Sequence, residues 1–225
     1  MEKKQEELIA AEKEKQKATI IERVNKYKKL SMIGPKFKNS TFEKANMEEI
    51  HMKIAKRYAD NFTKNNISKG LLLYGPSGVG KTYATCCIAN SLMQQQKAVL
   101  VLNLGLYIGE LKVNWDQAEQ ALLKAVENCD LLIIDDFGAE QSLDINKSNW
   151  RSEKIYNLID CCYRNEKPLI LSTNLNYSKE NTKCQISNSF PDRIKSRILD
   201  MCFPVSVIGK NKRGLEEFEF MELLK

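Results

Sequence analysis

Two apolar patterns alternate along most of the chain. Short, nearly continuous apolar runs lie at 70–74, 98–103, 130–136, 168–174 and 202–208. Between these runs, apolar residues recur at helical spacings of three, four and seven positions. Such runs are typical of strands buried on both faces, and strands that alternate with helices form a parallel sheet. The pattern predicts an α/β fold in which a five-stranded parallel sheet has helices on both faces.

The intervening segments contain helix signals. A helix is expected over 46–63, and another follows the glycine-rich loop after the first apolar run. Asp116 and Glu119 have the spacing of a capping box, which predicts a helix that ends near residue 127. Pro191 and Asp192 predict the first turn of a later helix.

The N-terminal 31 residues differ from the rest. They contain neither Gly nor Pro and are rich in strong helix formers. Ile20, Val24 and Tyr27 form a narrow apolar stripe at helical spacing. Two interpretations remain open: a solvated helix, or an arm that docks on a partner or on a neighbouring subunit.

A break follows this helix. The segment 33–42 contains Gly34-Pro35, which cannot continue a helix, and it is expected to be a linker. We therefore predict a charged helical arm with its linker at 1–36 and a globular domain at 37–225.

Composition narrows the class of protein. The chain has 225 residues, 43% of them hydrophobic, and a formal net charge of +6, which permits an anionic partner without implying one. It has seven Cys without metal-ligand spacing and a single His, so a zinc site is not expected. The unpaired Cys pattern and the lack of an apolar signal sequence predict reduced thiols in the cytoplasm. No apolar run is long enough to span a membrane, so no membrane association is expected.

The segment 75–82, "GPSGVGKT", fits the phosphate-loop pattern G-x-x-x-x-G-K-[ST] at every position, between an expected strand and an expected helix. Its glycines let successive N–H groups turn inward around phosphate, and the helix start adds its positive dipole end. Lys81 is expected to reach the β- and γ-phosphates of ATP, and Thr82 to offer its hydroxyl to Mg²⁺. The predicted cofactor-binding residues of this loop are Gly75, Pro76, Ser77, Gly78, Val79, Gly80, Lys81 and Thr82.

The run "LLIIDDFG" provides carboxylates for the same site. Asp135 ends a buried strand, and ligands of open α/β sheets bind at the carboxyl ends of strands. We predict that Asp135 is the second protein group at Mg²⁺, and that Asp136 polarises the attacking water.

The phosphate loop, "LLIIDDFGAE" and a strand that ends in "LSTNL" occur here in the order that resembles the DnaC/DnaI/IstB branch of the AAA+ ATPases. The resemblance covers roughly 37–214, and "FKNSTFE" (37–43) and "YADNF" (58–62) are similar to helicase loaders of phages and Gram-positive bacteria. The resemblance implies a five-stranded parallel sheet and either of two functions: a replicative helicase loader or a transposase helper.

The resemblance also implies further roles. Asn174 matches the sensor-1 position, which helps to hold the attacking water. Arg197 matches the arginine finger that acts in a neighbouring subunit, with Arg193 as the alternative, and Arg213 matches the sensor-2 arginine at the nucleotide.

Two departures from the family pattern change the expectation. Asp136 stands where AAA+ enzymes most often have Glu, and its shorter side chain predicts slow turnover. The chain has no Cys before Cys86, so the N-terminal zinc-binding domain of DnaI-type loaders is expected to be absent.

The predicted function is therefore ATP-dependent loading of a DnaB-type replicative helicase, with self-assembly through shared ATP sites and contact with single-stranded DNA. Tyr107, Lys112 and Trp115 are candidates for the DNA contact, or else core or interface residues. Two alternatives remain open: an IstB-like transposase helper, and an adaptor that binds the nucleotide without hydrolysing it.

Overall fold

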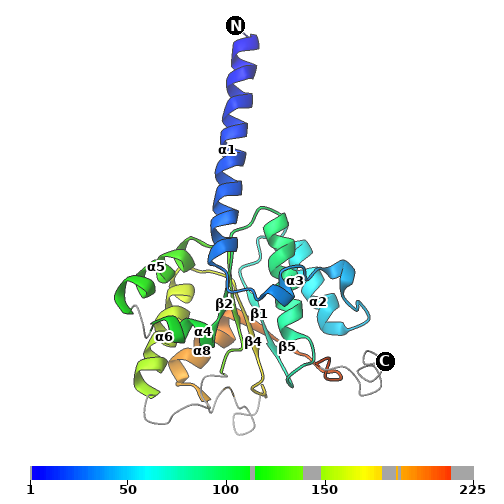
Figure 1. Ribbon diagram of the computed structural model, residues 1–225, viewed down its shortest axis with the longest axis vertical. Coiled ribbons are helices and arrows are strands. Elements are labelled where there is room, and N and C mark those ends of the chain that lie inside the picture. The colour runs from blue at the N-terminus through cyan, green and yellow to red at the C-terminus, as the bar shows by residue number, and fades with distance from the viewer. Residues whose placement is uncertain (1, 112–114, 139–147, 179–185, 187–188, 214–225) are drawn as a thin grey trace, which may run out of the picture.

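Five short strands pair in parallel into one sheet, in the order β2-β3-β4-β1-β5 (Figure 1). They are β1 (Gly70–Tyr74), β2 (Val99–Asn103), β3 (Leu131–Asp135), β4 (Leu169–Thr173) and β5 (Cys202–Ser206). Each lies within one of the five predicted apolar runs. The predicted parallel sheet is confirmed.

The structure is a computed structural model that describes residues 2–111, 115–138, 148–178, 186 and 189–213. Its α-helices are α1 (Glu2–Leu30), α2 (Ile50–Phe62), α3 (Lys81–Gln94), α4 (Leu104–Leu111), α5 (Trp115–Asn128), α6 (Ser148–Arg164) and α8 (Asp192–Met201). Two 3₁₀ turns, η1 (Pro35–Phe37) and η2 (Phe42–Lys44), precede α2. No helix in the described part of the chain is long and apolar enough to cross a membrane.

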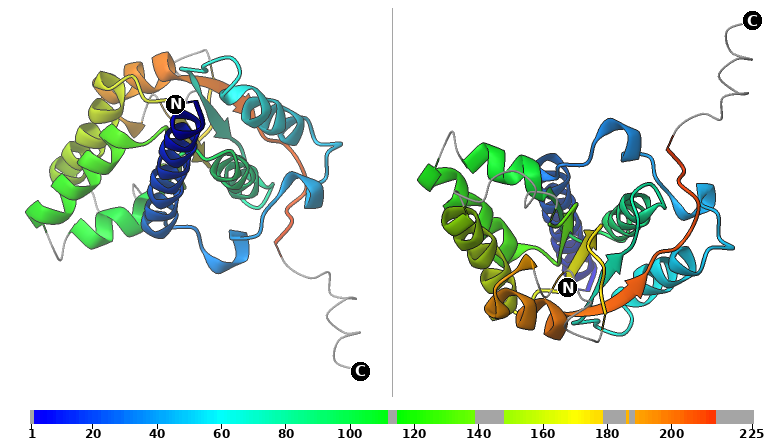
Figure 2. Two further views of the ribbon diagram at one scale, coloured as in Figure 1. Left: turned by 90° about the horizontal axis from the view of Figure 1, so that it is seen from above. Right: turned by 90° about the horizontal axis from the view of Figure 1, so that it is seen from below.

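Helices cover both faces of the sheet, as predicted. Alternate strand residues point to opposite sides: Leu72 and Leu132 enter a core with α4, α5, α6 and α8, whereas Leu73 and Ile133 enter a core with α2 and α3. Figure 2 shows these two groups of helices on either side of the strands. Strands β1 to β4 are buried from both faces, so their sequences are largely apolar instead of alternating, whereas the edge strand β5 leaves Phe203 exposed.

The strand order decides what lies at the carboxyl edge of the sheet. Tyr74 pairs in register with Thr173, and Asn103 pairs with Asp135, so the strands end at similar heights. Strand β4 lies between β1 and β3. The loop after β1 is therefore next to the end of β4 and close to the acidic end of β3.

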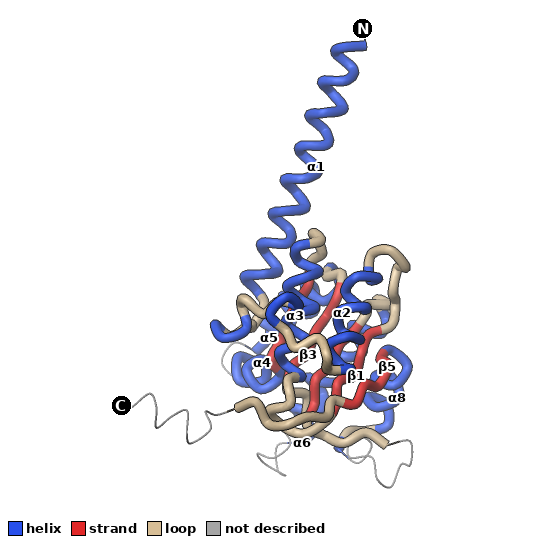
Figure 3. The backbone as a smooth tube through the Cα atoms, turned by 90° about the vertical axis from the view of Figure 1, so that its right-hand side faces the viewer, coloured by secondary structure: helices blue, strands red, loops and turns tan. Residues whose placement is uncertain are grey.

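Helix α1 extends away from the sheet as one long helix (Figures 1 and 3). Its side chains from residue 11 to residue 23 are exposed, whereas Tyr27 is only 4% exposed. The Tyr27 hydroxyl donates to the Ala125 carbonyl at 2.8 Å, and Arg23 pairs with Asp130 at 2.9 Å. From residue 11 onward, the contacts that anchor this helix in the globular part thus lie in its last two turns.

The chain just after α1 covers one edge of the sheet. The Met32 N–H donates to the Val101 carbonyl at 2.8 Å, and the Ser31 hydroxyl donates to the Val99 carbonyl at 3.2 Å. These contacts satisfy backbone groups on the outer side of β2, which an open edge strand would leave unpaired.

Two local expectations need correction. The predicted linker 33–42 is packed against α3, because the Asn90 amide donates to the Ser40 carbonyl at 2.8 Å and Phe42 is buried. Helix α5 begins at Trp115, so Asp116 lies inside it instead of capping it, and Glu119 pairs with Lys154 at 2.6 Å. The spacing of Asp116 and Glu119 suggested a capping box, but Glu119 pairs with Lys154 of α6 and not with the start of its own helix.

We predict that Tyr27→Ala lowers the free energy of unfolding by about 3 kcal/mol, because it removes a buried ring and leaves the Ala125 carbonyl without its hydroxyl donor. Urea denaturation measures this change. Ile21→Ala on the exposed part of the same helix is the control, with an expected change below about 0.5 kcal/mol. Equal changes for the two variants would contradict the anchoring role of Tyr27.

Candidate active site

The loop between β1 and α3 has backbone geometry that depends on glycine. Gly75, Gly78 and Gly80 have φ angles of +147°, +83° and +107°. A Cβ atom on Gly78 would come within 1.8 Å of the Asn211 Oδ1 atom, so both conformation and space favour glycine there. The loop ends at Gly80, the N-cap of α3, so that the positive end of the helix dipole faces the loop.

Lys81, the first residue of α3, is 5% exposed. Its ammonium donates to the Gly75 carbonyl at 2.9 Å, to the Pro76 carbonyl at 2.7 Å and to Asn174 Oδ1 at 2.7 Å. Burial lowers the pKa of Lys81 from its usual value, and the nearby carboxylates of Asp136 and Asp135 oppose this shift. The predicted phosphate-binding lysine and the predicted sensor-1 residue thus lie in direct contact.

Asp135, at the end of β3, is buried between two hydroxyl groups. It accepts hydrogen bonds from Thr82 Oγ1 at 3.1 Å and from the Ser172 hydroxyl of β4. Burial raises the pKa of Asp135, and the Ser172 and Thr82 donors partly offset that rise. Thr82 and Asp135 place two oxygen donors side by side, which is the ligand chemistry that Mg²⁺ prefers.

Asp136 has a different environment from its neighbour. Its φ angle is +55°, a left-handed conformation that Asp tolerates better than most residues. Its backbone N–H donates to the Ser172 hydroxyl at 3.2 Å, and its Oδ2 accepts from the Asn103 amide at 3.4 Å. The bend turns this carboxylate into the cavity that Lys81 also lines.

The chain after β5 crosses the phosphate loop. The Lys212 N–H donates to the Gly78 carbonyl at 2.9 Å, and Arg213 Nη1 donates to the Ser77 hydroxyl at 3.1 Å. The Lys212 ammonium also pairs with the Glu49 carboxylate at 2.6 Å. The predicted sensor-2 arginine is therefore at the loop, tied through its neighbour to the start of α2.

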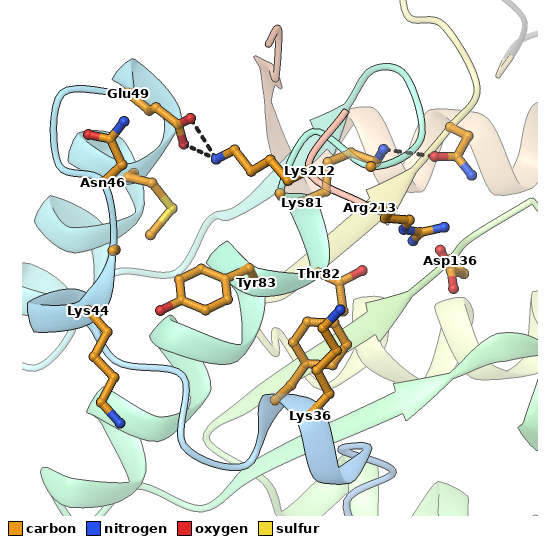
Figure 4. A pocket seen from close by; sticks show the side chains of 16 residues that line it. Lys36, Lys44, Asn46, Glu49, Lys81, Thr82, Tyr83, Asp136, Lys212 and Arg213 are labelled. Carbon is orange, nitrogen blue, oxygen red and sulfur yellow. Dashed lines mark hydrogen bonds and ion pairs between the residues drawn. The ribbon is translucent and has the colours of Figure 1, made fainter. Parts of the chain in front are cut away.

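These segments enclose a cavity of about 450 Å³ (Figure 4). Thr82, Asp136 and Arg213 lie toward one end of it, whereas Lys44 and Asn46 lie toward the other. Further lining residues, which the sequence motifs did not indicate, come from segments that flank the sheet: Lys36, Phe37, Lys44, Ala45, Asn46, Glu49, Met52, Tyr83 and Lys212. The "FKNSTFE" similarity was the only signal for this wall.

The two finger candidates on α8 are not among the residues that line this cavity. Arg197 is held by its own chain, with Nη2 at 2.8 Å from Asp160 Oδ1 and Nη1 donating to the Arg193 carbonyl at 2.8 Å. Arg193 is exposed, and its guanidinium lies 4.3 Å from the centre of the Tyr156 ring. A role for either arginine in phosphate chemistry would thus require the cavity of another subunit.

The predicted DNA-facing residues receive little support. Tyr107 is buried at 2% exposure, which favours the alternative that it is a core residue. Trp115 begins α5, and Lys112 lies outside the described residues.

The fold and this arrangement define the class of protein. A parallel sheet with a phosphate loop after β1 and a carboxylate at the end of β3, one strand beyond the intervening β4, is a P-loop nucleotide-binding fold of the AAA+ type. The chain belongs to the family of IstB-like ATP binding proteins, whose family profile matches residues 1–218. The predicted family is confirmed, and the match also includes α1, which the motifs did not cover.

The chain is also similar to proteins that are named replicative helicase loaders. The replicative helicase loader DnaI of Bacillus subtilis is 28% identical over 167 residues, which are 69% of this chain and 51% of DnaI. The replicative helicase loader DnaC of Escherichia coli K12 is 29% identical over 186 residues, 76% of this chain and 73% of DnaC. The chain therefore spans about half the length of DnaI.

Structural comparison agrees at the level of the fold. A crystal structure of DnaI matches with a TM-score of 0.61 at 23% identity, and the match covers 81% of this chain and 95% of that one.

We predict that Gly78→Ala lowers the free energy of unfolding by about 1–3 kcal/mol, because alanine is strained at a φ angle of +83° and its Cβ meets Asn211. Urea denaturation is again the measurement. Gly109→Ala, in α4 with no atom near its Cβ position, is the matched control and should change stability by less than about 1 kcal/mol in the stabilising direction. A Gly78→Ala protein as stable as the control would show that the loop does not need glycine.

Proposed function

We propose that this protein is an ATP-dependent replicative helicase loader that binds ATP with Mg²⁺, hydrolyses it slowly and assembles through shared ATP sites. The observation that supports this most strongly is the meeting of Lys81, Asn174 and the Thr82–Asp135 pair at one edge of the sheet. These groups come from three different strand ends, and together they suit a triphosphate with a divalent cation.

Phosphate binding is the first step of the proposed function. Lys81 would exchange its carbonyl partners for oxygens of the β- and γ-phosphates, while the loop N–H groups and Arg213 surround the rest. Thr82 and Asp135 suit Mg²⁺ by their oxygen chemistry. When bound, the ion would neutralise charge on the phosphate oxygens. The far end of the cavity, lined by Lys44 and Asn46, has room for the base.

Hydrolysis would depend on Asp136 and Asn174. Asp136 is held at its backbone by Ser172 and at its carboxylate by Asn103, so it is oriented as an acceptor for a water proton. Asn174, already bonded to Lys81, would orient the same water near the γ-phosphate. The short side chain of Asp136 supports slow turnover, which suits a switch.

Completion of the site by a neighbouring subunit is the third step. Neither Arg193 nor Arg197 lines the cavity of its own chain, so an arginine finger would come from the next subunit. Such a finger stabilises the charge of the transition state and contributes about 10³ to 10⁵ in rate in well-studied systems. The rate of ATP hydrolysis would then depend on the assembly of subunits. We keep Arg197 as the finger, with Arg193 as the alternative.

The helicase partner is supported by the relatives, two of which are named replicative helicase loaders. The exposed helix α1 gives the chain a long surface outside the ATPase fold with which it could hold a helicase ring. Release would follow when loss of the γ-phosphate changes the preferred arrangement of subunits. Single-stranded DNA is a further proposed ligand, for which no described residue gives specific support.

We predict that Lys81→Ala weakens ATP binding roughly 10- to 100-fold, because a charge-assisted hydrogen bond to phosphate is lost. Asp136→Ala should bind ATP as the wild type does but fail to turn it over. Fluorescent-nucleotide titration and steady-state phosphate release, with and without single-stranded DNA, measure the two effects. Wild-type loading activity in Asp136→Ala would instead identify an adaptor that does not need hydrolysis.

We further predict that the protein co-elutes with a hexameric DnaB-type helicase in the presence of ATP and Mg²⁺, and that Lys81→Ala reduces this complex. Size-exclusion chromatography with light scattering measures it, with a transposase of the kind served by IstB-like helpers as the parallel partner. A complex with the transposase and none with the helicase would assign the protein to the helper function that the family description suggests.

A further inference from the structure

Helices α6 and α8 pack against each other, and aromatic and acidic side chains on α6 meet two arginines on α8. Tyr156 and Asp160 are four residues apart on α6, and Arg193 and Arg197 are four apart on α8, so each pair shares one helix face. The Arg197 guanidinium lies 5.1 Å from the ring centre of Tyr156 and 5.3 Å from that of Tyr163. The cation therefore lies within cation–π distance of two aromatic rings of the neighbouring helix.

Asp160 fixes this cation from one side. Arg197 Nε donates to Asp160 Oδ1 at 3.0 Å, and Nη2 lies 2.8 Å from the same oxygen. Nη2 also donates to the Tyr156 hydroxyl at 3.3 Å, and Nη1 donates to the Arg193 carbonyl at 2.8 Å. These hydrogen bonds engage all three nitrogens of the guanidinium, and an N–H group on Nη1 is left for another acceptor.

The other oxygen of Asp160 has its own partner. Arg164, one turn further along α6, reaches Asp160 Oδ2 at 2.5 Å, while its side chain remains 74% exposed. The Asp160 side chain is 7% exposed and that of Arg197 is 24% exposed. Asp160 therefore has an exposed cation on one oxygen and the partly buried finger candidate on the other, and the two contacts can be removed separately.

We propose that Asp160 is a positioning residue that holds Arg197 in the orientation needed to reach the ATP of a neighbouring subunit. This inference rests on the proposed function, in which Arg197 completes the neighbour's site. A long arginine side chain has many rotamers in solution, and an effective finger must meet the γ-phosphate in one of them. The Arg197 side chain is held in that orientation by Asp160, Tyr156 and the Arg193 carbonyl before subunits assemble. It therefore loses little conformational entropy when the reaction occurs.

The arrangement also distinguishes the two arginines. Arg193 is exposed and contacts the face of the Tyr156 ring, whereas Arg197 is fixed on three of its nitrogens. A preorganised cation suits transition-state stabilisation, because its side chain does not lose further conformational entropy during the reaction.

The test compares Asp160→Asn, Arg164→Gln and Arg197→Ala variants of the full chain by steady-state ATP turnover with helicase and single-stranded DNA. Asp160→Asn should lower kcat about 10²-fold, since a displacement of about 1 Å can cost that much in rate. Its affinity for fluorescent ATP, measured with the isolated protein, should equal that of the wild type. Arg164→Gln removes the Oδ2 contact but leaves the Asp160–Arg197 pair intact, and it is the matched control, expected to keep kcat within about twofold.

A mixing experiment separates positioning from general damage to the fold. Lys81→Ala subunits cannot bind ATP well but carry an intact Asp160–Arg197 pair, whereas Asp160→Asn subunits have an intact phosphate loop. Each should turn over ATP far more slowly than the wild type when alone. Their mixture should regain turnover, because a Lys81→Ala subunit supplies the finger to an Asp160→Asn site. No gain on mixing would overturn the positioning role.

The remaining outcomes are also decisive. Wild-type or increased turnover in Asp160→Asn, together with an inactive Arg197→Ala protein, would overturn the inference and leave the proposed function intact. Full turnover in Arg197→Ala would instead refute the finger assignment on which the inference rests. Absence of turnover in the wild type under all conditions would refute the hydrolytic function and this role with it.

Discussion

The buried ammonium of Lys81 is the interaction on which the rest of the site depends. It joins the carbonyls of Gly75 and Pro76 to Asn174, and so fixes the loop after β1 against the end of β4. A charge in this position is tolerated only because oxygen acceptors and nearby carboxylates surround it. The contact requires β4 to lie beside β1, which the order β2-β3-β4-β1-β5 provides. The geometry of the site therefore depends directly on the order of the strands in the sheet.

The adjacent carboxylates of Asp135 and Asp136 have different environments at this edge of the sheet. Asp135 ends β3 in regular extended geometry and is enclosed by the Thr82 and Ser172 hydroxyls, whereas Asp136 turns away in a left-handed conformation toward the cavity. Burial raises the pKa of Asp135, and the hydroxyl donors favour its charged form. One residue is therefore suited to hold a cation and the next to accept a proton, although their side chains are chemically identical.

The cavity is assembled from both ends of the chain. The segment before β1 forms one wall, and the segment after β5 crosses the phosphate loop and pairs with it through Lys212 and Glu49. The finger candidate Arg197, by contrast, is fixed between α6 and α8 and is absent from the lining of this cavity. In the function that we propose, the cavity is lined by its own chain and an arginine from another subunit completes it.

The amino-acid sequence by itself determined the strands, the phosphate loop and the acidic end of β3, because apolar runs, glycine spacing and motif order are local patterns that survive without tertiary contacts. It did not determine that Ser172 supports Asp135, that Glu49 meets Lys212 or that Asp160 holds Arg197. Those pairs join residues far apart in the chain. They form only when strand order and helix packing bring the side chains together, so the tertiary structure alone decided them.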